Sequence, residues 1–82
     1  MPGRVPDIAH TIEQNLNQYF RMLDGEPAQG VYDMVVKQVE KPMLRCVMMQ
    51  CGGNQSKAAA VLGLNRNTLR KKLVEHGMLG IE

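Results

Sequence analysis

The side chains that are best suited to bind another molecule lie in one stretch near the C-terminus, and most of them are cationic. Between Asn54 and Lys72 the sequence contains five basic residues and no acidic residue. The first 52 residues hold five bases and six acids, a net charge of −1, whereas residues 53–82 hold five bases and two acids, a net charge of +3. This asymmetry indicates that the C-terminal third faces a polyanion, while the rest of the chain serves another purpose.

The same stretch has the spacing of two short helices joined by a tight turn. Asn54 suits the N-cap of a helix over residues 55–62, and Gly63 supplies the positive φ that a sharp turn requires. Asn65 then caps a second helix over residues 66–76, which ends at Gly77. Small and apolar residues predict a compact core between the two helices: Ala58, Ala59, Leu62, Leu64, Leu69 and Leu73. The pattern predicts a helix-turn-helix with a basic second helix.

The N-terminal end of that second helix carries residues that could recognise a nucleic acid. In a helix-turn-helix this end meets base edges in the major groove of DNA, and Asn65, Arg66 and Asn67 occupy it. Arginine is the usual ligand of guanine O6 and N7, and asparagine can pair with adenine. The sequence therefore predicts double-stranded DNA as a partner.

The segment from Val31 to Gln50 is apolar around most of its circumference. Its charged residues form one narrow stripe at helical spacing: Asp33, Lys37, Glu40, Lys41 and Arg45. A helix this apolar must be buried on more than one side, and 82 residues offer little material to cover it. A second copy of the chain is the economical cover, with an expected dimer interface formed by Val35, Val36, Val39, Met43 and Val47. Pro42 lies inside this helix and is expected to kink it or to split it in two.

An amphipathic helix is expected before this segment. Its apolar residues recur at three- and four-residue steps: Ile8, Ile12, Leu16, Tyr19, Phe20 and Leu23. Residues 24–27 then supply a helix stop and a turn. The chain is thus expected to be all-α, with four helices, or five if Pro42 breaks the second. Three parts are expected: a flexible N-terminus (1–7), a two-helix dimerisation core (8–51) and a helix-turn-helix DNA-binding unit (52–82).

Composition and spacing exclude several other classes of protein. No apolar run approaches the ~20 residues of a membrane span, and the N-terminus lacks the apolar stretch of a signal peptide. Cys46 and Cys51, far in sequence from His10 and His76, match neither a disulfide scaffold nor a zinc pattern. No nucleophile–base pair and no Gly-rich phosphate loop is recognisable. We expect an intracellular, soluble protein that is not an enzyme and binds no cofactor or metal.

The motifs of this chain resemble those of one family of DNA-binding proteins. The stretch GNQSKAAAVLGLNRNTLRKKL at residues 53–73 is similar to the DNA-binding end of the Fis family (factor for inversion stimulation). The motifs NQYF at 17–20, VYD at 31–33 and VEKPML at 39–44 resemble the same family, so the likeness covers nearly the whole chain. The C-terminal signature also closes enhancer-binding activators of the nitrogen-regulator type and does not separate the two.

The resemblance implies an intertwined homodimer of four-helix subunits, with the second helix kinked at Pro42 and one recognition helix per subunit. In that family the two recognition helices lie closer together than the groove repeat of straight DNA, so binding bends the duplex. Much of the specificity then depends on how easily a DNA sequence deforms. On this sequence the base-contacting positions of the family are Asn65 and Arg66. The positions that hold the phosphate backbone are Asn54, Ser56, Thr68, Arg70 and Lys71, with Lys72 as a weaker candidate.

Two departures from the family pattern change what we expect. Seven residues precede the first helix, where the best-known Fis proteins carry a longer segment with a mobile arm that touches a recombinase. Recombinase contact is therefore not expected. Val74 and Glu75 stand where the family often has lysines that hold flanking DNA. Contacts outside the core site should accordingly be weaker.

Three functions remain open at this point. The first is a small dimeric DNA-bending protein of the bacterial nucleoid, located in the cytoplasm and acting as a transcriptional regulator. The second is the terminal DNA-binding domain of a larger enhancer-binding activator. The third is a helical dimer that mediates protein interactions and keeps its basic residues for solubility.

Overall fold

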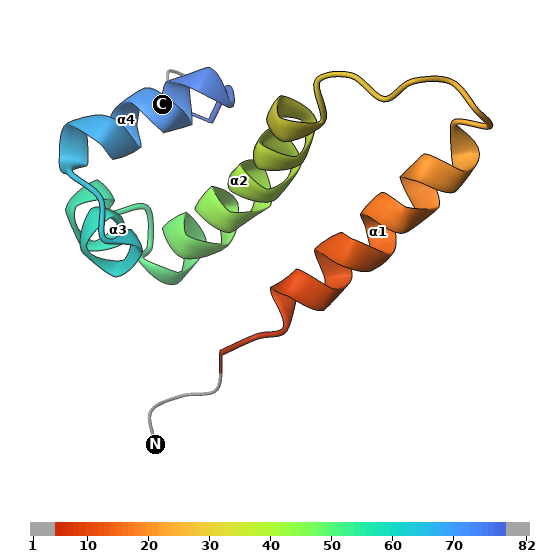
Figure 1. The fold of residues 1–82 in the computed structure, drawn as a ribbon. Helices are drawn as coiled ribbons and strands as arrows, with labels where there is room; N and C mark the ends of the chain where they lie inside the picture. Colours follow the sequence, from red (N-terminus) through yellow and green to blue (C-terminus); the bar gives the residue numbers. More distant parts are fainter. Residues whose placement is uncertain (1–4, 79–82) are drawn as a thin grey trace. The chain divides into compact units, whose positions relative to one another are not determined.

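This computed structural model describes residues 5–78, which contain four helices joined by short connecting segments (Figure 1). They are α1 (Ile8–Met22), α2 (Val31–Gln50), α3 (Gln55–Leu62) and α4 (Arg66–Glu75), and no strand occurs within the described residues. The expected all-α class is confirmed, and each helix lies where the sequence predicts it. The last helix is one residue shorter than expected, because His76 serves as its C-cap.

The chain divides into two compact units, Met1–Val31 and Tyr32–Glu82. The first unit contains α1, and the second contains α3, α4 and nearly all of α2. Within one chain, α2 therefore belongs with the helix-turn-helix. The expected division at residue 52, between a dimerisation core and a DNA-binding unit, concerns the assembly of two chains and stays a prediction.

α1 is an amphipathic helix with a half-buried apolar side. It begins after Asp7, whose Oδ1 accepts a hydrogen bond from the backbone N–H of His10 at 3.1 Å. Of the expected apolar stripe, Ile12, Leu16, Tyr19 and Leu23 are half-buried, Ile8 and Phe20 are exposed, and no residue of α1 is fully buried. The chain then turns at Asp24 and Gly25, which have φ angles of 51° and 90°. The predicted helix stop is confirmed.

α2 runs through Pro42 without interruption for 20 residues. The proline does not split the helix, so the described residues contain four helices and not five. The kink expected at Pro42 stays a prediction. Leu44 is the one fully buried residue of α2. Large apolar side chains elsewhere on this helix remain exposed, at Tyr32, Met43 and Met49.

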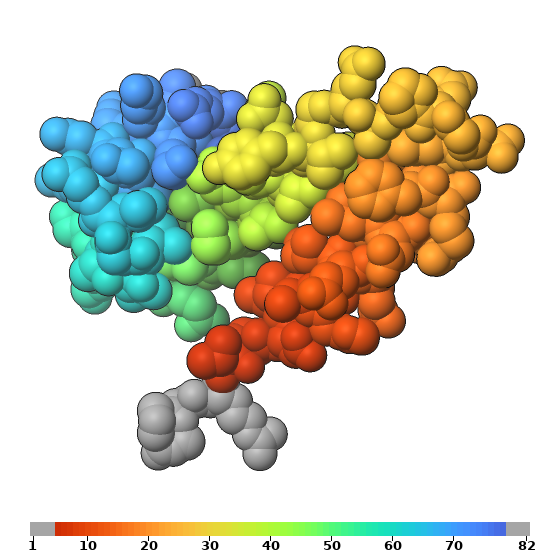
Figure 2. Space-filling view, in the orientation of Figure 1, coloured from red at the N-terminus to blue at the C-terminus, as the bar shows by residue number. Residues whose placement is uncertain are grey.

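A cluster of five buried apolar residues holds α2, α3 and α4 together. It consists of Leu44, Ala58, Ala59, Leu69 and Leu73, each at most 5% exposed. Partly buried residues pack around it: Val47, Met48, Cys51, Leu62 and Met78. In the space-filling view the green surface of α2 meets the cyan and blue surfaces of α3 and α4 (Figure 2). The inward positions predicted for α3 and α4 are confirmed, except that Leu62 and Leu64 are only half-buried.

The residues expected at a dimer interface do not form the centre of this core. Val35, Val36 and Val39 are half-buried, and Met43 is exposed. Val47 packs partly against the core of its own chain. Apolar side chains of α2 thus remain partly or fully exposed in the single chain. The dimer interface stays a prediction.

Shortening a buried leucine of the cluster should strongly destabilise the second unit. Leu69→Ala truncates a side chain that is 0% exposed, and it should lower the free energy of unfolding by about 2–5 kcal/mol. Val61→Ala, at a side chain 67% exposed on α3, is the control and should change that free energy by less than about 0.5 kcal/mol. Urea denaturation followed by circular dichroism measures both. Equal effects of the two substitutions would contradict the assigned core.

Candidate nucleic-acid interface

The turn between α3 and α4 is built on Gly63. Its φ of +72° lies in the left-handed region, which a residue with a Cβ adopts only under strain. The Gly63 N–H donates to the Ala60 carbonyl at 3.2 Å, and the Leu64 N–H donates to the Ala59 carbonyl at 2.9 Å. These bonds satisfy carbonyls that the end of α3 would otherwise leave unpaired. The predicted glycine turn is confirmed, and it directs the chain from α3 into α4.

Both helices of the motif begin with an asparagine cap, as predicted. Asn54 Oδ1 accepts a hydrogen bond from the Lys57 N–H at 3.0 Å. Asn65 Oδ1 accepts from the N–H of Asn67 at 2.7 Å and of Thr68 at 3.4 Å. Because each Oδ1 is engaged, each asparagine offers a ligand mainly its Nδ2 donor group. In this arrangement Asn65 lacks the free acceptor that a bidentate contact with adenine requires.

Most of the predicted contact residues are exposed, at the start of α3 and along α4. Those that the structure leaves exposed are Asn54, Ser56, Asn65, Arg66, Thr68, Arg70 and Lys71. Within residues 5–78, the cations Arg66, Arg70 and Lys71 form no ion pair with a carboxylate. Their charges are therefore available to an external anion.

The outer side of α4 is polar because its inner side is committed to the core. Leu69 and Leu73 lie one turn apart and are buried. Asn67 and Lys71 consequently fall on the opposite side of the helix, and both are exposed. An α-helix about 10–12 Å across fits a major groove about 12 Å wide. The outer side of α4 thus has the shape and the polarity of a recognition helix.

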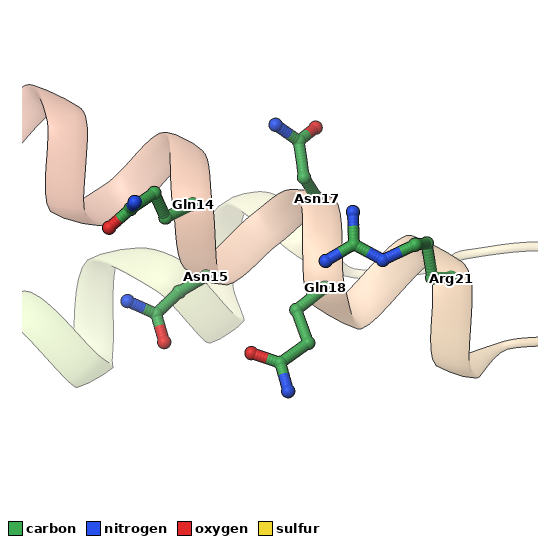
Figure 3. A pocket seen from close by; sticks show the side chains of 5 residues that line it. All are labelled: Gln14, Asn15, Asn17, Gln18 and Arg21. Atoms are coloured by element: carbon green, nitrogen blue, oxygen red, sulfur yellow. The ribbon is translucent and has the colours of Figure 1, made fainter.

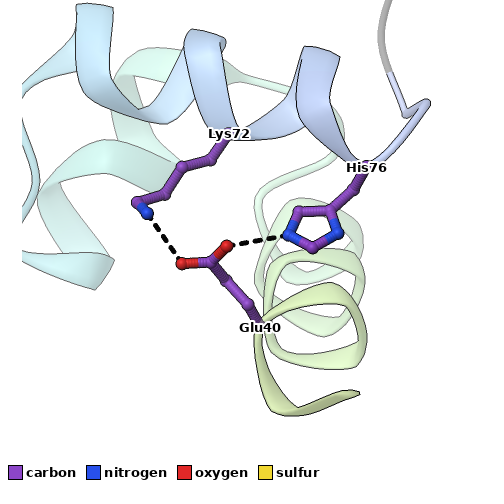
Figure 4. Close-up of polar contacts among 3 residues, drawn as sticks. All are labelled: Glu40, Lys72 and His76. Carbon is purple, nitrogen blue, oxygen red and sulfur yellow. Dashed lines mark hydrogen bonds and ion pairs between the residues drawn. The ribbon is translucent and has the colours of Figure 1, made fainter. Parts of the chain in front are cut away.

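Lys72 departs from the rest of the expected contact set. Its Nζ lies 2.7 Å from Glu40 Oε2, and His76 Nε2 lies 2.8 Å from Glu40 Oε1 (Figure 4). One carboxylate of α2 thereby holds two side chains from the C-terminal end of α4. The side chain of Glu40 is 15% exposed and that of Lys72 is 32% exposed, so water partly reaches the pair. While the pair persists, the ammonium group of Lys72 faces α2, and its expected DNA contact stays a prediction.

The two charged groups of this contact stabilise each other. The hydrogen bond from Lys72, assisted by the contact with His76, lowers the pKa of Glu40 below its ordinary value of 4.5. The hydrogen bond to Glu40 raises the pKa of Lys72 above its ordinary value of 10.5. Both groups therefore remain charged at neutral pH, and the contact links α2 to α4 as an ion pair.

Glu40 and His76 are residues of this region whose contact the sequence patterns miss. Glu40 belongs to the charged stripe of α2 and lies 32 residues before Lys72, so no local spacing indicates the pair. The one hint of this contact in the sequence is that Glu40 is an acid placed between two bases of the charged stripe, Lys37 and Lys41.

A separate hollow along α1 offers polar contacts but no catalytic arrangement. It has a volume of about 430 Å³ and is lined by Gln14, Asn15, Asn17, Gln18 and Arg21 (Figure 3). Within residues 5–78, no three His, Cys, Asp or Glu side chains converge as a metal site would require, and Cys46 and Cys51 are free thiols. None of the helices in the described range combines the length and the apolar character needed to cross a lipid bilayer.

Comparisons with known proteins agree with this geometry. The family model for bacterial regulatory proteins of the Fis family matches residues 35–76, which include all of α3 and α4. A protein of Neisseria meningitidis serogroup B named as Fis-like and DNA-binding is 67% identical over 79 residues, 96% of this chain and 100% of the relative. A similarly named protein of Ralstonia nicotianae is 53% identical over 72 residues, 88% of this chain and 94% of the relative. The DNA-binding protein Fis of Actinobacillus succinogenes is 49% identical over 71 residues, 87% of this chain and 72% of the relative.

Replacing Glu40 by glutamine should destabilise the second unit over a defined pH range. The lowered pKa of Glu40 means that its stabilisation is complete above about pH 4.5 and is lost as the pH falls through the folded-state pKa. The raised pKa of Lys72 means that its share is complete below about pH 10.5 and is lost only as the pH rises through the folded-state pKa. The urea midpoint of Glu40→Gln should therefore lie below that of the wild type at neutral pH, and the difference should shrink in acid.

Glu13→Gln is the control for this measurement. Glu13 is an exposed carboxylate of α1, outside the second unit, and within residues 5–78 it forms no ion pair. Its urea midpoint should follow that of the wild type from neutral to acid pH. A difference between Glu40→Gln and the wild type that does not change with pH would contradict the electrostatic origin of the contact.

Proposed function

Since this chain belongs to the Fis family of bacterial regulatory proteins, we propose that it binds and bends double-stranded DNA as a homodimer. It acts in the cytoplasm as a nucleoid-associated transcriptional regulator, and its role is binding and not catalysis. The observation that carries this proposal is the exposed cationic surface of a capped helix-turn-helix. Three cations of α4 without a carboxylate partner in the described chain lie on a helix whose inner side is fixed by the core.

In this proposal Arg66 is the main reader of base identity. It is the first residue of α4, so its side chain starts from the end of the helix that enters the major groove. Its guanidinium group can donate two parallel hydrogen bonds to O6 and N7 of guanine. Asn65 adds a contact at the base edges through Nδ2, because its Oδ1 caps the helix.

The phosphate backbone is held by groups on both sides of the turn. Donors from the start of α3 come from Asn54 and Ser56, and those from α4 come from Thr68, Arg70 and Lys71. The backbone N–H groups at both helix N-termini add partial positive charge where a phosphate would approach. Lys72 can contact a phosphate only when its ion pair with Glu40 opens.

The proposal of a homodimer is supported by the apolar side chains of α2 that one chain leaves partly or fully exposed. The valines of α2 predicted at the interface are at best half-buried, and Met43 is exposed. A dimer built on α2 presents two copies of α4, and their separation decides whether straight DNA can reach both. We propose that the separation is shorter than one helical repeat, so that the duplex bends to make both contacts.

Salt titration of DNA binding should distinguish contacts with phosphates from contacts with bases. If about three cations per subunit meet phosphates, log affinity of the dimer should fall against log salt with a slope near −5. Lys71→Ala should weaken binding to all sequences about equally and flatten the slope by ~1 per lost contact. Arg66→Ala should cost ~1–3 kcal/mol per half-site and relax the base preference there. Fluorescence anisotropy with related duplexes measures both. Absence of salt-dependent binding to any duplex would favour a helical dimer that does not use DNA.

Introducing a charge on the proposed dimer face should abolish dimerisation and DNA binding together. Val39→Asp places a carboxylate on an apolar side of α2 that is half-buried in the single chain. Sedimentation velocity reports the dimer, and gel shifts of circularly permuted fragments report binding and bending. Gln38→Asp, at an exposed neighbour, is the control and should sediment as the wild type does. Specific binding by a monomeric Val39→Asp protein would overturn the dimer.

A further inference from the structure

Three cations on α2 form an exposed row that the proposed DNA interface does not use. Lys37, Lys41 and Arg45 follow one another at four-residue steps, so they lie on one side of the helix, and all three are exposed. They line a groove of about 670 Å³, to which Glu75 and His76 at the end of α4 also contribute. The groove therefore lies between the side of α2 and the C-terminal end of the recognition helix.

This row is unfavourable for the isolated helix. Like charges four residues apart on a helix repel each other. In residues 5–78 none of the three cations forms an ion pair, although Asp33 precedes Lys37 by four residues on the same side. Glu40, the nearest acid along α2, is already engaged by Lys72 and His76. The groove is thus lined by three cations that form no ion pair within residues 5–78 and by one carboxylate, that of Glu75.

The row also points away from the face that a dimer would bury. Lys37, Lys41 and Arg45 each follow a residue of the predicted interface by two positions, namely Val35, Val39 and Met43. Two positions on an α-helix correspond to a rotation of about 200°. Dimerisation through those apolar residues therefore leaves the cationic groove open to a third molecule.

The groove continues the phosphate-contacting side of α4. Lys71 and Glu75 lie one turn apart on the same side of that helix, and Glu75 lines the groove. A sugar-phosphate strand that passes Lys71 and follows this side would next meet the row on α2. From Lys37 to Arg45 the helix rises about 12 Å, which corresponds to three to four base-pair steps when it is measured along the axis of the duplex.

We propose that this groove binds the sugar-phosphate backbone of DNA that flanks the core site. The inference rests on the proposed function, since it extends the path of the same duplex. It also changes the expectation that contacts outside the core site are weak. Although Val74 and Glu75 replace basic residues at the end of α4, cations of α2 would bind the flanking DNA instead. The contact carries no base preference, because a row of cations recognises only the phosphate charge.

The test compares two duplexes that share one core site. The short duplex spans about two helical turns (~21 base pairs) and the long one about five turns (~52 base pairs). The test variant carries Lys37→Gln, Lys41→Gln and Arg45→Gln. A second variant adds Gln14→Lys, Asn17→Lys and Gln18→Lys, which restore the net charge at exposed positions of α1 (Figure 3). Thermal unfolding by circular dichroism checks that both variants fold as the wild type does.

For the wild type, the slope of log affinity against log salt should be steeper on the long duplex than on the short one. The difference should approach 5 if all three cations of both subunits meet phosphates, at about 0.9 per contact. In both variants this difference should fall close to zero. The variant with restored charge should still bind the short duplex as the wild type does, which separates the position of the charges from their number.

Two outcomes would overturn the inference. One is a length-dependent slope that persists in the triple glutamine variant. The other is a wild-type slope that is the same on both duplexes, as expected if the groove instead receives an acidic protein surface. Failure of the wild type to bind even the short duplex would be a different result, because it would reject the proposed function itself.

Discussion

The orientation of α4 depends on a very small buried cluster. Leu44, Leu69 and Leu73, with two alanines of α3, fill the space in which three helices meet. A small domain buries little apolar surface, so each of these contacts is a large share of its net stability. The alanines matter as much as the leucines, because larger side chains there would push α4 away from α3. Every outward residue of the recognition helix is therefore placed by contacts on the opposite side of the same helix.

Glu40 adds direction to this packing. Apolar contacts are not directional, whereas the hydrogen bonds of Glu40 with Lys72 and His76 tie the C-terminal end of α4 to one level of α2. Because α2 also carries the proposed dimer face, the same carboxylate would connect the dimer to the recognition helix. In the proposed function, the separation of the two recognition helices decides how far DNA bends, so a link near the end of α4 would affect that geometry directly.

The sequence predicts those features that depend on neighbouring residues. Asn54, Gly63 and Asn65 act on backbone groups within four positions, so their roles could be inferred from spacing alone. The contact of Glu40 with Lys72 joins positions 32 residues apart and depends on how α2 and α4 cross, which no local pattern encodes. Pro42 shows a third case. Its chemistry allows either a bent or a broken helix, and the sequence alone does not decide between them, whereas the structure has one helix that runs through Pro42 for 20 residues.

The capping role of Asn65 has a consequence for how DNA would be read. Its Oδ1 is engaged by the backbone of α4, which leaves the guanidinium of Arg66 and the exposed amide of Asn67 as the side-chain groups at this end that can make a bidentate contact. One such arginine in each subunit discriminates few base pairs. In the proposed function, most of the affinity therefore comes from phosphate contacts and from the ease with which the duplex deforms, and both depend on the whole site more than on single bases. A protein built in this way would occupy many sites with graded affinity, in contrast to a repressor that reads one operator through several base-specific contacts.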